Sequence, residues 1–102
     1  MTELTNENFD EAVKNGVSVV KWYANWCMPC RTMDPIFTEV ENDFDNVNFT
    51  KVDVDGEMEL SKKYGIRSIP ITMFFKDGEM MDKIVGKTSK DIIKNKITDL
   101  LS

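Results

Sequence analysis

The chain has 102 residues, which suits a single domain over residues 1–102 and leaves little room for a second. It is 41% hydrophobic and 30% charged, as globular proteins are, and no apolar run approaches the roughly 20 residues of a transmembrane helix. The net charge of −5, without clustered Lys and Arg, argues against nucleic-acid binding. The absence of histidine excludes histidine metal sites, catalytic triads and imidazole bases.

The N-terminal half predicts a helix, a buried strand and a second helix. Thr5 or Asn6 can cap the first helix, and a short strand in residues 1–4 would precede it. The apolar stripe of this helix is Phe9, Ala12 and Val13, and Asn15-Gly16 would end it. Residues 17–24 are mostly apolar, as in a strand covered on both faces. From Met28 the period is helical, with Pro35 expected to kink or split the helix and a stripe of Met33, Ile36, Phe37, Val40 and Phe44.

The C-terminal half predicts two further helices and three strands. Residues 47–54 read as a strand and residues 57–65 as a short helix. Residues 71–86 form a predicted hairpin around Asp77-Gly78. Ser89 would cap a last helix with a stripe of Ile92, Ile93, Ile97, Leu100 and Leu101. Strand–helix–strand units imply parallel pairing, and the hairpin adds antiparallel strands. We therefore expect an α/β fold, a mixed sheet with helices on both faces.

The two cysteines, Cys27 and Cys30, allow three interpretations. A structural zinc site needs about four ligands, so two copies of the chain would have to share one. A purely structural disulfide would close a very small loop, and the entropic benefit of a disulfide falls with loop length. A redox dithiol is the third interpretation, and this spacing beside a strand–helix–strand unit is typical of one.

The predicted elements favour the redox interpretation. Cys27 falls where the strand over residues 17–24 gives way to the next helix, whose unpaired N–H groups and dipole stabilise a thiolate. Cys30 lies one turn further on, close enough to attack a mixed disulfide. Pro29 has a preset φ and helps to start the helix.

The sequence resembles the thioredoxin family along essentially its whole length. The resemblance rests on WCMPC (26–30), Pro35, Lys51 with Asp53, GIRSIP (65–70), KDGE (76–79) and VGKTSK (85–90), in order and at matching separations. It implies the thioredoxin fold and a protein-disulfide reductase, with Cys27 as the nucleophile and Cys30 as the resolving thiol. It also implies that the redox-active disulfide serves in place of a bound cofactor and that no metal is held.

The resemblance further implies a docking surface and partners. Pro70 would be a cis-proline facing the cysteines, and Ile69 would offer its backbone to an extended substrate segment. The expected substrate-binding residues are Trp26, Met28, Pro29, Ile69, Pro70, Val85 and Gly86. A trans Pro70, a Trp26 that only packs and a Gly86 that only turns the chain stay open as alternatives. Protein disulfides and an NADPH-linked thioredoxin reductase are the implied partners. With no visible signal peptide, we expect a cytoplasmic monomer that binds neither membranes nor nucleic acid.

Two positions depart from the family pattern. Met28 replaces the usual glycine and adds apolar area beside Cys27. Lys21 replaces the usual buried aspartate, while its companion Lys51 is present. Two neighbouring ammonium groups lower each other's pKa, so either one lysine is partly neutral or a side chain extends to water. We hypothesise that Lys21 stabilises a thiolate electrostatically; the alternative is that it simply reaches solvent.

Two other functions are alternatives to the reduction of protein disulfides. The same dithiol could oxidise or isomerise protein thiols, because direction depends on potential and compartment. Alternatively the fold could be a binding module with incidental cysteines.

Overall fold

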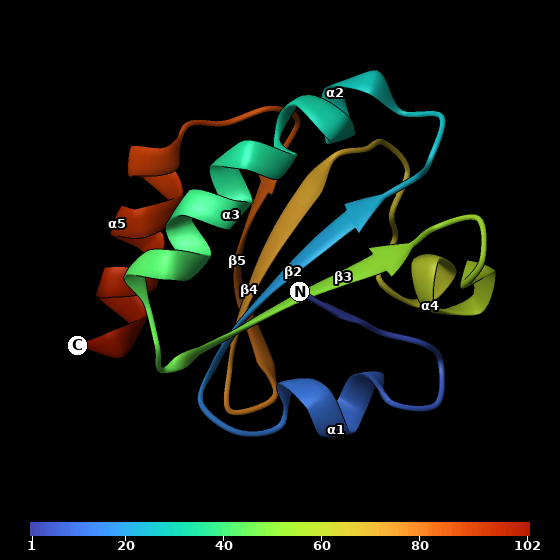
Figure 1. Cartoon of the computed structure of the whole chain (residues 1–102). Helices are drawn as coiled ribbons and strands as arrows, with labels where there is room; N and C mark the ends of the chain where they lie inside the picture. The colour runs from blue at the N-terminus through green and yellow to red at the C-terminus, as the bar shows by residue number, and fades with distance from the viewer.

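A five-stranded sheet forms the centre of the protein (Figure 1). The computed structural model describes residues 1–102. The strands are β1 (Thr2–Glu3), β2 (Val17–Tyr23), β3 (Val47–Asp53), β4 (Ile71–Lys76) and β5 (Glu79–Val85), in the spatial order β1-β3-β2-β4-β5. β3 pairs in parallel with β1 and β2, whereas β4 pairs antiparallel with β2 and β5. The predicted mixed sheet is confirmed, including the short first strand.

Helices cover both faces of this sheet. They are α1 (Phe9–Val13), α2 (Met28–Thr32), α3 (Asp34–Asp43), α4 (Met58–Lys63) and α5 (Lys90–Leu101). Side chains of α1 and α4 enter one apolar core and side chains of α3 and α5 enter the other. In Figure 1 α3 and α5 accordingly lie together on one side of the sheet, with α1 and α4 on the other. None of the helices combines the length and the apolar composition that crossing a membrane requires.

Strand β2 is buried on both faces, as its composition predicts. Val20 and Trp22 enter the core beneath α1 and α4, while Val17 and Val19 enter the core beneath α3 and α5. Because side chains alternate along a strand, Lys21 follows Val17 and Val19 to the α3 side. The alternation thus places a lysine at the edge of a hydrophobic core, directly below the turn that carries the cysteines.

The predicted interruption at Pro35 is confirmed. α2 ends at Thr32 and α3 begins at Asp34, with Met33 between them. Proline has no N–H to donate to the carbonyl four residues earlier, so the hydrogen-bond ladder cannot pass through it. The break gives α2 and α3 separate axes, and it leaves Asp34 in the first turn of α3.

The predicted cap of α1 is wrong. The helix begins at Phe9, its cap position is held by Asn8, and no side chain caps it. Asn8 Oδ1 instead accepts a hydrogen bond from the Thr5 N–H at 2.7 Å. Asn6 Oδ1 accepts one from the Leu60 N–H of α4 at 3.0 Å. Asn6, one of the two residues expected to cap α1, therefore ties the preceding loop to another helix, and Asn8 fixes that loop locally.

The hairpin and the cap of α5 form as predicted. Asp77 and Gly78 have φ of 50° and 89°, the left-handed conformation that a tight two-residue turn requires. Ser89 Oγ accepts a hydrogen bond from the Ile92 N–H at 3.3 Å.

The apolar stripe of α5 is narrower than expected. Ile93 and Ile97 are fully buried and Leu100 is half-buried, but Ile92 and Leu101 are 47% and 38% exposed. Ile92 lies off the face that positions 93, 97 and 100 share, and Leu101 is the last residue of the helix.

A pair of substitutions in α5 tests this narrower stripe. Ile97→Ala should lower the free energy of unfolding by about 2–5 kcal/mol, since it leaves a cavity in a packed core. Ile92→Ala, on the same helix but exposed, should change it by less than about 0.5 kcal/mol. Urea unfolding of both variants measures the difference. Equal losses would place Ile92 in the core after all.

Candidate active site at the cysteine pair

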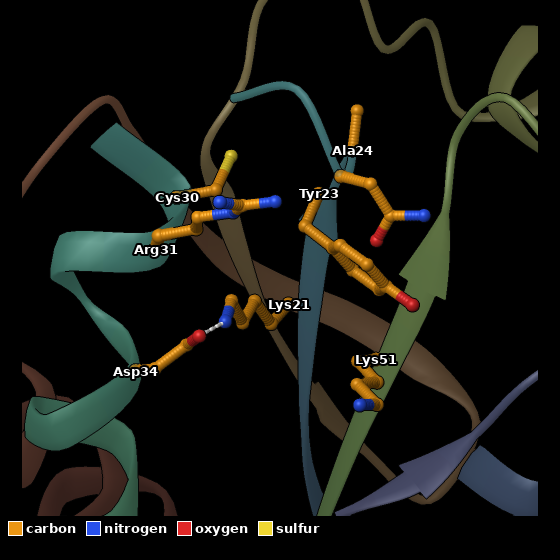
Figure 2. A pocket seen from close by; sticks show the side chains of 8 residues that line it. Lys21, Tyr23, Ala24, Cys30, Arg31, Asp34 and Lys51 are labelled. Carbon is orange, nitrogen blue, oxygen red and sulfur yellow. Dashed lines mark hydrogen bonds and ion pairs between the residues drawn. The ribbon is translucent and has the colours of Figure 1, made fainter. Parts of the chain in front are cut away.

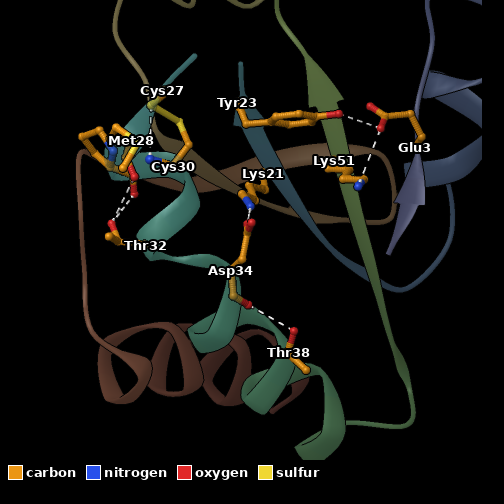
Figure 3. Close-up of polar contacts among 11 residues, drawn as sticks. Glu3, Lys21, Tyr23, Cys27, Met28, Cys30, Thr32, Asp34, Thr38 and Lys51 are labelled. Atoms are coloured by element: carbon orange, nitrogen blue, oxygen red, sulfur yellow. Dashed lines mark hydrogen bonds and ion pairs between the residues drawn. A yellow bond between two sulfur atoms is a disulfide. The ribbon is translucent and has the colours of Figure 1, made fainter. Parts of the chain in front are cut away.

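Cys27 and Cys30 form a disulfide at the junction of β2 and α2 (Figure 3). Cys27 holds the cap position of α2 with an extended backbone, and its sulfur accepts a hydrogen bond from the Cys30 N–H at 3.2 Å. The Cα atoms of the two cysteines are 5.3 Å apart. The predicted position of Cys27, at the first unpaired N–H groups of a helix, is confirmed. In this oxidised state only 3% of Cys27 and 2% of Cys30 is exposed, so the disulfide presents a narrow edge to solvent.

Exposed apolar side chains flank this edge. Trp26 and Met28, the neighbours of Cys27, are 70% and 64% exposed, and Pro29 is exposed as well. The Trp26 indole N–H donates to Asp55 Oδ2 at 2.8 Å, which holds the ring in place. Val85 is 58% exposed at the end of β5. The apolar area beside the disulfide is therefore real surface rather than core.

The loop before β4 meets the disulfide from the other side. Ile69 packs against the small cluster formed by Ala24, Cys27 and Cys30. The peptide bond between Ile69 and Pro70 is cis, so the alternative of a trans Pro70 is wrong. The Gly86 N–H donates to the Pro70 carbonyl at 2.8 Å. This bond ties Gly86 to the loop before β4.

A polar cavity of about 180 Å³ lies on the α3 side of the cysteines (Figure 2). Its walls come from β2 and the loop that follows it, the second half of α2, the start of α3 and β3. The lining residues are Lys21, Tyr23, Ala24, Asn25, Cys30, Arg31, Asp34 and Lys51. Cys30 is thus the sulfur-bearing residue that faces this cavity, whereas Cys27 lies on the outer side of the helix start. No group of three or more His, Cys, Asp or Glu side chains is placed to hold a metal ion.

Lys21 lies in this cavity without reaching solvent. Its side chain is 6% exposed and forms an ion pair with Asp34. Its Nζ is 5.4 Å from the centre of the Phe37 ring, an additional favourable contact for a cation. The alternative that Lys21 extends to water at the sheet's end is therefore wrong. Lys51, whose side chain is 37% exposed, is the lysine with access to solvent.

The two lysines are neighbours, as the sequence predicts. Lys21 and Lys51 are directly paired across β2 and β3. Burial lowers the pKa of Lys21, and the charge of Lys51 lowers it further. The Asp34 carboxylate acts in the opposite sense, because an opposite charge in contact favours the protonated lysine.

A third element fixes the outer wall of the cavity. Tyr23 donates its hydroxyl hydrogen to Glu3 Oε1 at 2.7 Å, and the Lys51 Nζ lies 3.9 Å from the same oxygen (Figure 3). Burial, and then the bond to Glu3, raise the pKa of Tyr23 well above its ordinary value. Glu3 of the edge strand β1 therefore offsets the charge of Lys51, while Asp34 is the carboxylate that pairs with Lys21.

Sequence reasoning missed Asp34, Tyr23 and Arg31 as part of this site. A signal was available for Asp34. A lysine in a strand covered on both faces needs a carboxylate nearby, and Asp34 stands at the start of the helix that follows the cysteines. Tyr23 and Arg31 had no comparable signal, because a tyrosine at the end of a strand or an arginine beside a motif is unremarkable until the walls of the cavity are known.

Comparison with known proteins assigns the chain to a family. The profile of the family described as thioredoxin matches residues 1–99. A thioredoxin from Mycoplasmoides gallisepticum is 46% identical over 96 residues, covering 92% of this chain and 96% of that protein. A thioredoxin from Staphylococcus saprophyticus is 38% identical over 92 residues, covering 89% and 88%.

Solved structures agree with these sequences. The oxidised mitochondrial thioredoxin 3 of Saccharomyces cerevisiae has a TM-score of 0.91 and 32% identity, covering 98% of this chain and 95% of that one. The thioredoxin of Plasmodium falciparum has a TM-score of 0.88 and 29% identity, covering 97% and 98%. Taken with the disulfide at the start of α2, these matches show that the chain belongs to the thioredoxin family and is a protein thiol-disulfide oxidoreductase with a redox-active Cys27–Cys30 pair.

Proposed function

We propose that this protein reduces disulfides in other proteins, with Cys27 as the attacking sulfur and Cys30 as the resolving one. The observation that carries the assignment is the Cys30 N–H, which donates to the Cys27 sulfur at the cap of α2. In the reduced protein the same donor and the helix dipole stabilise a thiolate on Cys27. The Cys30 sulfur is not at the cap position of the helix, because Cys30 lies within the first turn of α2.

The reaction then runs in two exchanges. The Cys27 thiolate attacks one sulfur of the substrate disulfide, forming a mixed disulfide and releasing the other substrate sulfur as a thiolate. Cys30 loses its proton, and its thiolate attacks the Cys27 sulfur. The Cys27–Cys30 bond forms while the bond to the substrate breaks, and the second substrate thiolate leaves with the electron pair. Two electrons pass to the substrate, and the protein ends as the disulfide seen here.

The docking surface for this reaction is the apolar rim around the disulfide. It consists of Trp26, Met28, Pro29, Ile69, Pro70, Val85 and Gly86. Support comes from the exposure of Trp26, Met28 and Val85 and from the packing of Ile69 against the cysteine cluster. An extended substrate segment would pair with the backbone of Ile69 by strand addition. Main-chain hydrogen bonds and apolar contacts depend little on the sequence of the substrate. This surface would therefore accept many protein disulfides.

We infer the partners from membership of the family. A flavin-dependent thioredoxin reductase that draws on NADPH would return the disulfide to the dithiol, in the manner of the family. We place the protein in the cytoplasm as a single-domain monomer, because a dithiol that donates electrons needs a reducing compartment. The opposing candidate is an oxidase or isomerase of protein thiols.

The redox potential of the protein distinguishes a reductase from an oxidase or isomerase. Equilibration of the protein in thiol–disulfide buffers should give a potential below the cytosolic glutathione poise of about −220 to −260 mV, since a reductant must be the stronger donor. The fraction of disulfide can be read from alkylation with a mass tag. A potential far above that range would make the protein an oxidant.

Serine substitutions at the two cysteines test their roles. Cys27→Ser should lose all reduction of a protein disulfide, because no attacking thiolate remains. Cys30→Ser should lose turnover yet accumulate a covalent complex through Cys27, visible on a non-reducing gel. A complex that forms through Cys30 in Cys27→Ser would reverse the assignment. Survival of the cellular function in the double serine variant would instead identify a binding module.

Lys21 has a proposed role in the second exchange. It lines one cavity with Cys30, and a buried ammonium there would favour the Cys30 thiolate electrostatically. Lys21→Met should raise the pKa of Cys30 by about one unit, and Lys21→Asp should raise it further, because an opposite charge is lost and a like charge is added. Thiolate absorbance against pH, in a Cys27→Ser background, measures the shift. An unchanged titration curve for Cys30 would remove the electrostatic role.

A further inference from the structure

The ion pair between Lys21 and Asp34 joins the centre of the sheet to the first turn of α3, beside the cavity that Cys30 faces. We propose that Asp34 is a positioning residue for the second exchange, which holds the Lys21 ammonium protonated in this cavity as a fixed positive charge for the Cys30 thiolate. This inference rests on the proposed role of Lys21 and adds the residue on which that role depends. Asp34 itself touches neither the substrate nor the sulfurs.

The surroundings of Lys21 disfavour a charged lysine without Asp34. The side chain is 6% exposed and lies against the Phe37 ring. The charged side chain directly across the sheet is Lys51, and Arg31 of α2 lines the same cavity. Asp34 is therefore the anion that meets Lys21 within a predominantly cationic wall.

Apart from Arg31, which forms no ion pair, the remaining charged and titratable groups near the cavity are engaged elsewhere. Tyr23 and Lys51 both interact with Glu3 of β1. Glu41 of α3, which lines the neighbouring hollow with Lys21, pairs with the N-terminal ammonium of Met1 at 3.6 Å. On the other side of β2 the strand partner of Lys21 is Thr72, which is uncharged. Lys21 thus has one counter-charge in contact, and the other carboxylates have their own cations.

The position of Asp34 is set by the break before Pro35. Asp34 stands in the first turn of α3, where the helix dipole favours a carboxylate. Its carbonyl accepts a hydrogen bond from Thr38 Oγ1 at 3.1 Å (Figure 3). Its side chain is 58% exposed, so the carboxylate keeps much of its hydration while it neutralises a buried ammonium. In Figure 2 the Lys21 side chain runs from β2 toward α3 and ends at Asp34, with Cys30 and Arg31 on the adjoining turn.

The chemical consequence concerns the proton of Cys30. With Lys21 kept protonated, the pair does not accept that proton, which leaves for solvent at the open side of the cavity. The ammonium then stabilises the thiolate that attacks the Cys27 sulfur. A carboxylate at position 21 would work differently, as a proton acceptor. The two arrangements predict opposite electrostatic effects on Cys30, and this difference makes the proposal testable.

The test is the titration of Cys30 in the full chain carrying Cys27→Ser, followed by thiolate absorbance. Burial raises the pKa of Tyr23 and Tyr64, so tyrosinate absorbance stays above the thiol range. Asp34→Asn should raise the pKa of Cys30 by about one unit, a tenfold loss of thiolate at fixed pH, because Lys21 loses its proton. In a Lys21→Met background the same substitution should change nothing, and Asp34→Glu should restore the original curve.

The sign of the shift decides the outcome. Were Asp34 acting directly on Cys30, removal of its negative charge would lower the pKa of Cys30, and that result overturns the proposal. An unchanged curve in Asp34→Asn, or an equal shift with and without Lys21, overturns it as well. Asp10→Asn is the matched control, since Asp10 is also an acidic residue in a first helical turn paired with a lysine, Lys63, at 3.8 Å. None of these measurements requires turnover, so they remain valid if the protein proves to be no reductase.

Discussion

The hydrogen bond from the Cys30 N–H to the Cys27 sulfur is the contact on which the proposed chemistry of this protein depends. It exists because β2 is buried on both faces and ends where α2 starts, so that the cap position of the helix falls on Cys27. A sulfur in that position receives the unpaired donors that any helix start presents. The apolar cores on both sides of the sheet hold this junction rigid, and the reactivity of the pair is therefore a property of the whole fold.

The charged cavity behind Cys30 shows how the fold accommodates Lys21, one of the two residues that depart from the family pattern. A lysine in the middle of a covered strand is costly unless a counter-charge meets it. The break before Pro35 supplies one, because it ends α2 early and leaves Asp34 at the start of a new helix on the same side of the sheet. The exposed half of the pair remains hydrated, so the desolvation cost falls mainly on one group. Lys51 is separated from this pair by its own contact with Glu3.

The architecture was largely predictable from the sequence, whereas the cavity was not. Hydrophobic periodicity, the Asp77-Gly78 turn, the Ser89 cap and the position of Pro35 are local signals, and each led to the observed element. The cap of α1 was mispredicted because the Asn6 side chain satisfies a backbone N–H of α4 and the helix begins later in the chain, after Asn8. Ile92 was assigned to the core because composition alone does not fix the width of a helical stripe. The sequence offers Asp34 as a candidate carboxylate for Lys21, but their contact depends on how α3 packs against the sheet, which no short-range pattern encodes.

The margins of the sheet have a consequence for how another chain can approach. β1 has only two residues, and β5 carries Glu79, Asp82 and Lys83 on an exposed strand. Short or charged edge strands are poor templates for β-sheet pairing with another chain. Pairing of another polypeptide with either edge of the sheet is therefore disfavoured, which leaves the proposed docking surface around the disulfide as the place where a substrate segment would add.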